Sequence, residues 1–231
     1  MITLSKEEKL RKFFENQIRQ LLLLLSLSSV FYIGYGFIDV PHGKWLNLTT
    51  KEWFVTALLV PFIHQIYVWF CWRIELYYKK ISSIFGERGY KLYSHLFGIL
   101  VITRFFTLIA VCISDYDSLY IPGFIKYTTA VILLVPALYA IYSVLRYFDI
   151  KRIPGEDHFK PQEYKKKPFV KKGMYEDSSN VMYVYVGLIF VGLAVLHSSK
   201  AALLITIYSY TAVWIHYFCT EKPDINYIYG D

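Results

Sequence analysis

Six long apolar stretches restrict this chain to a membrane fold. Each approaches the roughly 20 residues that an α-helix needs to cross a hydrocarbon core of about 30 Å. They are Leu21–Ile38, Glu52–Trp72, Leu92–Ser114, Tyr120–Leu145, Asn180–His197 and Ala201–Cys219. Their apolar residues are continuous and do not alternate with polar ones, which disfavours a transmembrane β-barrel. We therefore expect an all-α fold, a polytopic transmembrane helical bundle of about six spans.

The basic residues between these stretches alternate in number along the chain. Lys and Arg number five before the first span, then two, five, zero, nine, one and one in successive segments. Basic residues are retained on the cytoplasmic side of a membrane, or on its equivalent such as the mitochondrial matrix. Both termini and the 73–91 and 146–178 loops are therefore predicted on this inside face. Topology also explains the net charge of +7, so no nucleic-acid partner is expected.

Hydropathy and charge divide the chain into four parts. Residues 1–20 predict an interfacial amphipathic helix, because its apolar side chains share one helical stripe: Leu10, Phe13, Phe14 and Ile18. Residues 21–145 are expected to form a four-span bundle, 146–178 a basic inside loop, and 179–231 a helical hairpin and tail. The basic loop suits a topology signal, attraction to anionic headgroups, a lid over a site, or a docking surface for a partner.

Arg104 lies near the middle of the third span, where a lone cation is costly. No acidic residue is expected at a matching depth. Its partner must then be a carbonyl, a tyrosine hydroxyl, an anionic lipid or another subunit, so Arg104 is a candidate lipid-binding residue. The three cysteines form no CxxC and no spaced His/Cys cluster, and we predict no metal site.

Short motifs follow one another in order from Gly173 onward. They are Gly173-Met174-Tyr175, Asn180-Val181-Met182-Tyr183, Leu193–Ser199 followed by Leu203-Leu204, Thr220-Glu221, and Tyr229. In this order they resemble the G-x-Y opening, the N-P-M-Y element, the hairpin turn and the terminal acidic element of the small integral membrane methyltransferases. That group comprises the phospholipid (phosphatidylethanolamine) and isoprenylcysteine carboxyl methyltransferases.

The resemblance implies an S-adenosylmethionine site at the inside end of the hairpin. The fifth span starts there near Asn180 and the sixth returns there at Glu221, so the two residues become neighbours. The resemblance implies a catalytic role for Glu221 and Asn180, and cofactor binding by Glu221, Asn180, Tyr183, Gly173 and Tyr175. Glu221 would pair with a cationic part of the cofactor. The implied reaction is methyl transfer to a phospholipid amine or a similar lipid-embedded acceptor.

Departures from the family pattern leave a second function open. Val181 replaces the proline of N-P-M-Y, Thr220 replaces one glutamate of an acidic pair, and Ser179-Asn180-Val181 stands where the carboxyl methyltransferase branch has R-H-P. The glycine-rich element expected near the span before the hairpin is also missing, because Pro136–Ala140 offers small residues but no GxG. The alternative is a catalytically inactive relative that serves as an accessory or structural subunit of a membrane complex, for instance a mitochondrial respiratory one.

Each function has its own expected partners and location. Membrane lipids are expected in both cases, and other membrane-protein subunits in the second. The endoplasmic reticulum and the mitochondrial inner membrane are equally compatible with the charge pattern, because both have a basic-retaining inside face.

The charge pattern makes a direct prediction about topology. In sealed vesicles, a protease that cuts the 146–178 loop from outside the vesicle should also remove a tag fused to the carboxy terminus, because both lie on one face. Immunoblotting of the tag with and without detergent measures this. A tag that stays protected while the loop is cut would contradict the six-span topology.

Overall fold

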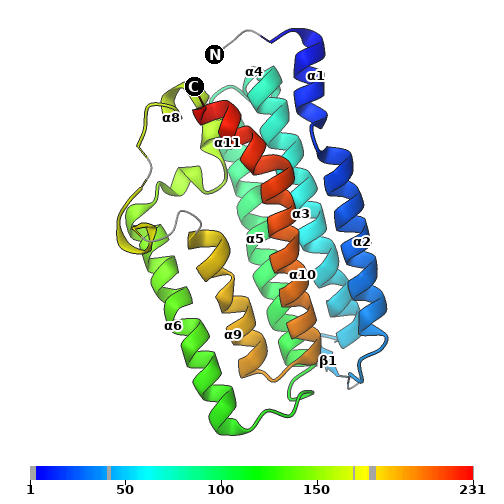
Figure 1. Cartoon of the computed structure of the whole chain (residues 1–231). Coiled ribbons are helices and arrows are strands. Elements are labelled where there is room, and N and C mark those ends of the chain that lie inside the picture. The colour runs from blue at the N-terminus through cyan, green and yellow to red at the C-terminus, as the bar shows by residue number, and fades with distance from the viewer. Residues whose placement is uncertain (1–3, 41–42, 169, 177–180, 231) are drawn as a thin grey trace.

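The chain forms a bundle of long helices in the computed structural model, which describes residues 4–40, 43–168, 170–176 and 181–230 (Figure 1). The long helices are α2 (Gln17–Tyr35), α3 (Thr50–Tyr78), α5 (Arg88–Ser114), α6 (Gly123–Tyr147) and α10 (Lys200–His216). The shorter helices are α1 (Lys6–Phe14), α4 (Lys80–Phe85), α7 (Glu156–Phe159), α8 (Pro161–Tyr164), α9 (Leu188–Leu196) and α11 (Lys222–Tyr229). Two short strands, β1 (Lys44–Trp45) and β2 (Leu48–Thr49), pair antiparallel before α3.

The predicted all-α transmembrane bundle is confirmed. Within the described residues, five helical stretches are long and apolar enough to cross a membrane: Lys6–Tyr35, Thr50–Tyr78, Arg88–Ser114, Gly123–Tyr147 and Lys200–Tyr229. The fifth predicted span is shorter than expected, because the apolar helix Met182–Leu196 is only about 22 Å long at 1.5 Å per residue. Large apolar side chains stay exposed on α2 and α6, as expected for lipid-facing surfaces: Leu22, Val30, Phe124, Ile132 and Val135.

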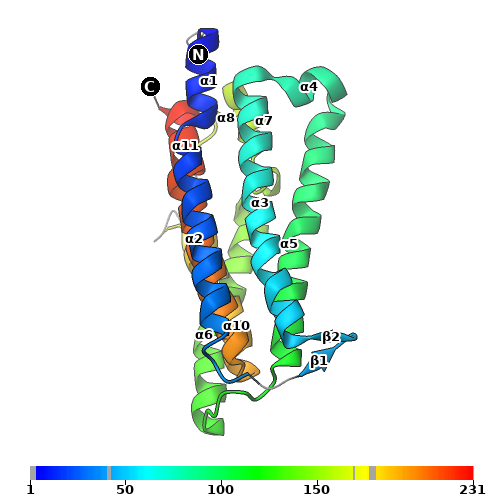
Figure 2. The same cartoon turned by 90° about the vertical axis from the view of Figure 1, so that its right-hand side faces the viewer.

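The two ends of the bundle differ in what they carry. Helices α1, α4, α8 and α11 lie at one end, and the β1–β2 hairpin lies at the other (Figures 1 and 2). We call the first the inner end, because it holds both basic loops. The described residues of the predicted 1–20 segment include α1 and the start of α2, with Asn16 between them in the left-handed region at φ 63°. An interfacial position for this segment remains a prediction.

Small residues let α3, α5 and α10 pack closely. Ala57, Ala110, Ala201 and Ala202 are buried where these helices meet. Close approach favours helix association in a membrane, where lipid tails are as apolar as the side chains themselves. Gly192 serves the same purpose between α9 and α6, since a Cβ there would lie 2.6 Å from Leu134.

A buried carboxylate joins the two turns at the outer end. Asp115 Oδ2 accepts hydrogen bonds from the Ser118 hydroxyl at 2.8 Å, the Ser199 hydroxyl at 2.7 Å and the Ala201 amide at 2.8 Å. Ser199 is also the N-cap of α10 and accepts from the Ala202 amide at 3.0 Å. The α5–α6 and α9–α10 turns are thereby fixed to each other.

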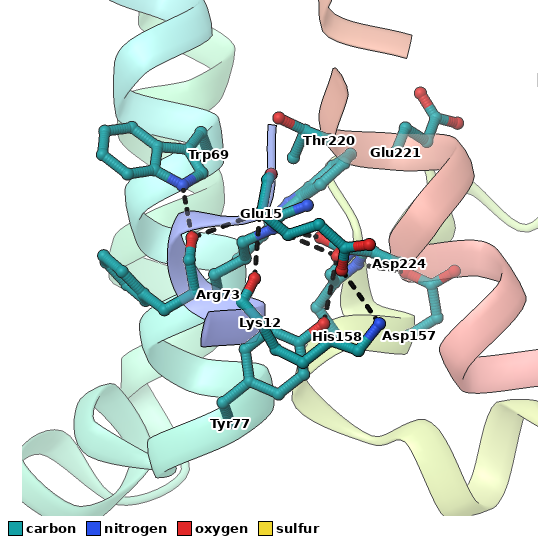
Figure 3. Close-up of polar contacts among 12 residues, drawn as sticks. Lys12, Glu15, Trp69, Arg73, Tyr77, Asp157, His158, Thr220, Glu221 and Asp224 are labelled. Carbon is teal, nitrogen blue, oxygen red and sulfur yellow. Dashed lines mark hydrogen bonds and ion pairs between the residues drawn. The ribbon is translucent and has the colours of Figure 1, made fainter. Parts of the chain in front are cut away.

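A buried ion pair joins the elements of the inner end (Figure 3). Arg73 Nε of α3 lies 3.1 Å from Asp224 Oδ1 of α11, and both side chains are 0% exposed. Arg73 Nη1 donates to the carbonyls of Lys12, Phe13 and Glu15, and Nη2 to the carbonyl of Cys219. One guanidinium therefore connects α3, the α1–α2 turn, the end of the α10 helix and α11.

Breaking this ion pair should destabilise the bundle strongly. Arg73→Met leaves the Asp224 carboxylate buried without its partner, which typically costs about 3–5 kcal/mol. Circular dichroism of thermal unfolding in detergent would measure the loss, with Arg88→Met on the exposed start of α5 as the matched control. The double variant Arg73→Met/Asp224→Leu should recover part of it, because a buried apolar pair needs no counter-charge. Equal stability of Arg73→Met and the control would contradict this role.

Candidate functional site

Two π-helical turns face each other at the inner end of the carboxy-terminal hairpin. They are Met182–Val186, before α9, and Tyr217–Glu221, after α10. The Tyr183 hydroxyl donates a hydrogen bond to Glu221 Oε2, and the Tyr183 and Tyr217 rings lie 5.6 Å apart. π turns occur frequently at functional sites. The hairpin thus brings together Tyr183 and Glu221, two residues that the family resemblance assigned to one site.

Beside this contact lies a cavity of about 280 Å³ with charged residues in its wall, which we call the inner cavity. It is bounded by α3, the 146–178 loop, both π turns and α11. Its lining residues are Trp72, Phe148, Arg152, Ile153, Gly155, Asp157, His158, Met182, Tyr183, Tyr217, Glu221 and Ile225. Among the described residues, no group of three His, Cys, Asp or Glu side chains could hold a metal ion.

Asp157 lies among the charged residues of this cavity wall. Its Oδ1 lies 2.9 Å from His158 Nδ1, and its Oδ2 lies 3.7 Å from Arg152 Nε. The Tyr229 hydroxyl donates to the same Oδ2 at 2.9 Å. Burial would raise the pKa of Asp157, but His158, Tyr229 and Arg152 hold it below its ordinary value. The wall therefore carries a fixed negative charge at neutral pH.

His158 carries the opposite charge. Its Nε2 lies 3.5 Å from Asp224 Oδ2, so the ring stands between two carboxylates. Burial alone would lower the pKa of His158, but Asp157 and Asp224 raise it to about 9. The ring stacks on Trp72 with centroids 4.0 Å apart and planes at 20°. A protonated imidazole over an indole face is further stabilised by the ring quadrupole.

Gly155 allows the loop to approach Trp72 this closely. Its φ of +94° lies in the left-handed region, and a Cβ there would lie 2.3 Å from Trp72 Nε1. The indole nitrogen donates to the carbonyl of Pro154 at 2.9 Å. Another residue at position 155 would push the loop, and with it Asp157 and His158, away from the cavity.

The remaining predicted site residues lie elsewhere. Asn180 falls outside the described residues. Gly173 and Tyr175 do not belong to the cavity lining but stand behind it: the Tyr175 ring stacks on Phe148, which does line the cavity, at 5.3 Å and 17°. Gly173 has φ +60°, and a Cβ there would lie 2.8 Å from the Tyr147 ring. In the described part of the chain, Tyr175 therefore supports the wall through Phe148, and Gly173 lies outside the wall.

Sequence reasoning missed Trp72, Arg152, Asp157 and His158. The available signal was Glu156-Asp157-His158, two acids and a histidine in a row, directly after Pro154-Gly155 in a loop with an excess of basic residues. The loop folds over the inner end, and its helix α7 packs against α3 and α11. Charged residues expected on a solvated loop are therefore buried in a wall.

A second, mostly apolar cavity of about 240 Å³ lies within the bundle, and we call it the deep cavity. It shares Trp72, Ile153, Met182 and Tyr183 with the inner cavity. Its apolar lining includes Val68, Phe97, Val101, Phe105, Phe190 and Val213. Its lining also includes polar residues, among them Arg104, His64, Gln65 and His216. The two cavities thus meet at one shared wall.

Comparison with known proteins identifies the carboxy-terminal part of the chain. Residues 125–231 match the family model described as phospholipid methyltransferase. The match begins in α6 and extends over the 146–178 loop, both π turns and α11. No curated protein and no solved structure matches the chain.

The charge of His158 predicts how stability changes with pH. The folded pKa of about 9 exceeds the ordinary value of 6.5, so this stabilisation is complete below about pH 6.5 and disappears as pH rises through about 9. Between about pH 6 and pH 10, the wild type should lose up to about 3 kcal/mol more stability than His158→Gln. Melting temperatures of both proteins across this range measure the difference. If the melting temperatures of the two proteins changed in parallel with pH, the His158 ring would be neutral.

Proposed function

We propose that this chain transfers a methyl group from S-adenosylmethionine to a lipid-embedded acceptor, in the first place a phospholipid amine. The proposal starts from its membership of the phospholipid methyltransferase family through its carboxy-terminal part. One observation carries the proposal: the inner cavity, which has charged residues in its wall, and the mostly apolar deep cavity share a wall. The reaction joins a charged, water-soluble cofactor to a lipid, so each needs a cavity of its own polarity. The two cavities must also meet where the methyl group passes.

The residues of the inner cavity fit the cofactor. S-adenosylmethionine has a cationic sulfonium and amine, an anionic carboxylate and a flat adenine. Glu221 and Asp157 offer carboxylates to the cationic groups, and Arg152 offers a guanidinium to the carboxylate. Phe148 and Tyr217 provide aromatic faces against which a flat base can pack.

The predicted residues outside the cavity lining have supporting roles in this proposal. Asn180 directly precedes Val181 and would hold a polar edge of the cofactor. Tyr175 holds Phe148 by stacking, and Gly173 lets the chain pass close to Tyr147. These two residues would act on the cofactor through the wall that they support.

Most of the chain's contribution would be positioning and exclusion of water. When bound, the cofactor supplies an electrophilic methyl group and leaves as a neutral thioether. Tyr183 orients the Glu221 carboxylate by its hydrogen bond. Trp72 and Met182, which belong to both cavities, would close the transfer point to water. An ammonium acceptor must lose a proton before it can react, and we assign Glu221, assisted by Asn180, to receive it.

The open inner cavity also bears on the accessory-subunit alternative. A relative that has lost catalysis has no need to keep a cofactor-sized space, and side chains can fill it. Met182 and Tyr183 instead line the cavity and leave about 280 Å³ open. This supports the methyltransferase function over the accessory one.

Neutralising Glu221 should weaken cofactor binding. Glu221→Gln keeps the shape and removes the charge, and a charge-assisted contact of about 1.5–3 kcal/mol corresponds to a loss of tenfold or more in affinity. Calorimetric titration of purified protein with S-adenosylmethionine measures it. Glu87→Gln, which removes an exposed carboxylate between α4 and α5, should bind like wild type. No binding by wild type would refute the proposed function, and unchanged binding by Glu221→Gln would remove Glu221 from the site.

A further inference from the structure

The deep cavity contains a cation, Arg104, for which the described part of the chain supplies no counter-charge in the lining. Arg104 of α5 lines it, and the Nε of Arg104 is shielded from solvent with no hydrogen-bond partner among the described residues. Among the described residues, those that line the deep cavity include no aspartate or glutamate. A guanidinium in such surroundings is expensive unless an anion compensates it. The cavity is therefore incomplete without an anionic or strongly accepting ligand.

Two histidines add hydrogen-bond donors to the same cavity. Both ring nitrogens of His64 are buried without a partner in the described structure, and so is Nε2 of His216. Gln20 Nε2 lies 3.5 Å from His216 Nδ1. The oxygen of the same side-chain amide, Gln20 Oε1, accepts a hydrogen bond from the Thr220 hydroxyl at 2.6 Å. This arrangement makes Nδ1 the acceptor and leaves the proton on Nε2 of a ring that lines the cavity. Arg104, His64 and His216 together offer donors to an oxyanion.

The position of these donors matches a lipid that enters from the inner side. Helix α5 starts at the inner end (Figure 2). Helical side chains tilt toward the start of their helix, so the Arg104 side chain leans toward the inner end. His64 and Trp72, which both line the deep cavity, are eight residues apart on α3, a rise of about 12 Å. In a bilayer leaflet, a phospholipid's amine is closer to water than its phosphate. An amine at the shared wall would place the phosphate toward Arg104.

We propose that the deep cavity recognises the acceptor lipid by its phosphodiester oxyanion, with Arg104 as the main contact and His64 and His216 as supporting donors. A phosphate offers the planar guanidinium fork two oxygens at once. The positive charge of Arg104 also repels an amine, so the amine end turns toward the inner cavity. Arg104 is thus a positioning residue that orients the lipid. The inference rests on the proposed function only in naming this lipid as the acceptor.

Lipid binding without cofactor tests the proposal separately from methyl transfer. Purified protein in neutral detergent is equilibrated with tritiated dioleoylphosphatidylethanolamine and challenged with three unlabelled competitors. Phosphatidylethanolamine and phosphatidylmethanol, which has the phosphodiester but no amine, should compete equally. Oleylamine, which has an amine but no phosphate, should compete at least tenfold less well. Equal competition by oleylamine would overturn the proposal whatever the variants do.

Variants assign this selectivity to Arg104. Arg104→Gln should lower affinity for both phosphodiester lipids at least tenfold, whereas Arg88→Gln on the exposed start of the same helix should not change it. Arg104→Lys keeps the cation and should retain part of the selectivity if the glutamine variant does not fold. Unchanged lipid affinity in a folded Arg104→Gln would overturn the assignment.

Turnover provides a second readout if the wild type methylates lipid. The phosphate contact is the same before and during methyl transfer, so Arg104→Gln should raise KM and leave kcat nearly unchanged. A fall in kcat alone would overturn the positioning role. Lipid selectivity without any methyl transfer would support the binding site and refute the proposed function.

Discussion

The buried pair between Arg73 and Asp224 is the constraint on which the inner end depends. Two charges without water are tolerated only when close partners surround both, and here the partners come from four separate segments. The pairing continues beyond Asp224. His158 lies 3.5 Å from Asp224 and 2.9 Å from Asp157, and Arg152 lies 3.7 Å from Asp157. Positive and negative groups thus alternate from α3 into the inner cavity, so the wall that would face a charged cofactor is continuous with the contacts that hold the bundle together.

Trp72 divides the molecule into a polar and an apolar compartment. Its indole stacks on the protonated His158 at 4.0 Å, and its ring lies 5.6 Å from that of His216, which lines the deep cavity. Trp72, together with Ile153, Met182 and Tyr183, therefore forms a boundary of single side chains between two chemically different spaces. A reaction between a polar and an apolar molecule requires such a thin and ordered boundary, because the reacting atoms must approach within a few ångströms.

The sequence predicted what depends on local pattern or on helix length. Apolar stretches and alternating charge predicted the helical bundle, and helix rise predicted that the two ends of the hairpin meet, as Tyr183 and Glu221 do. It did not predict Arg73–Asp224, because those residues are 151 positions apart and nothing local marks them as a pair. His158 was missed for a related reason: its role depends on the path of an irregular loop that packs against α3. Asn180 falls outside the described residues.

The order of the chain has a consequence for assembly in the membrane. Arg73 is synthesised early, at the end of α3, but Asp224 follows only after all the other helices described here up to α10. Until then the Arg73 guanidinium lacks the Asp224 carboxylate as its partner. Because Arg73 lies at the inner end, its guanidinium can contact water or headgroups during this time. Closure of the inner end is thus coupled to completion of the last helix. The inner cavity, whose walls include residues of α3 and α11, exists only in a chain that has finished folding.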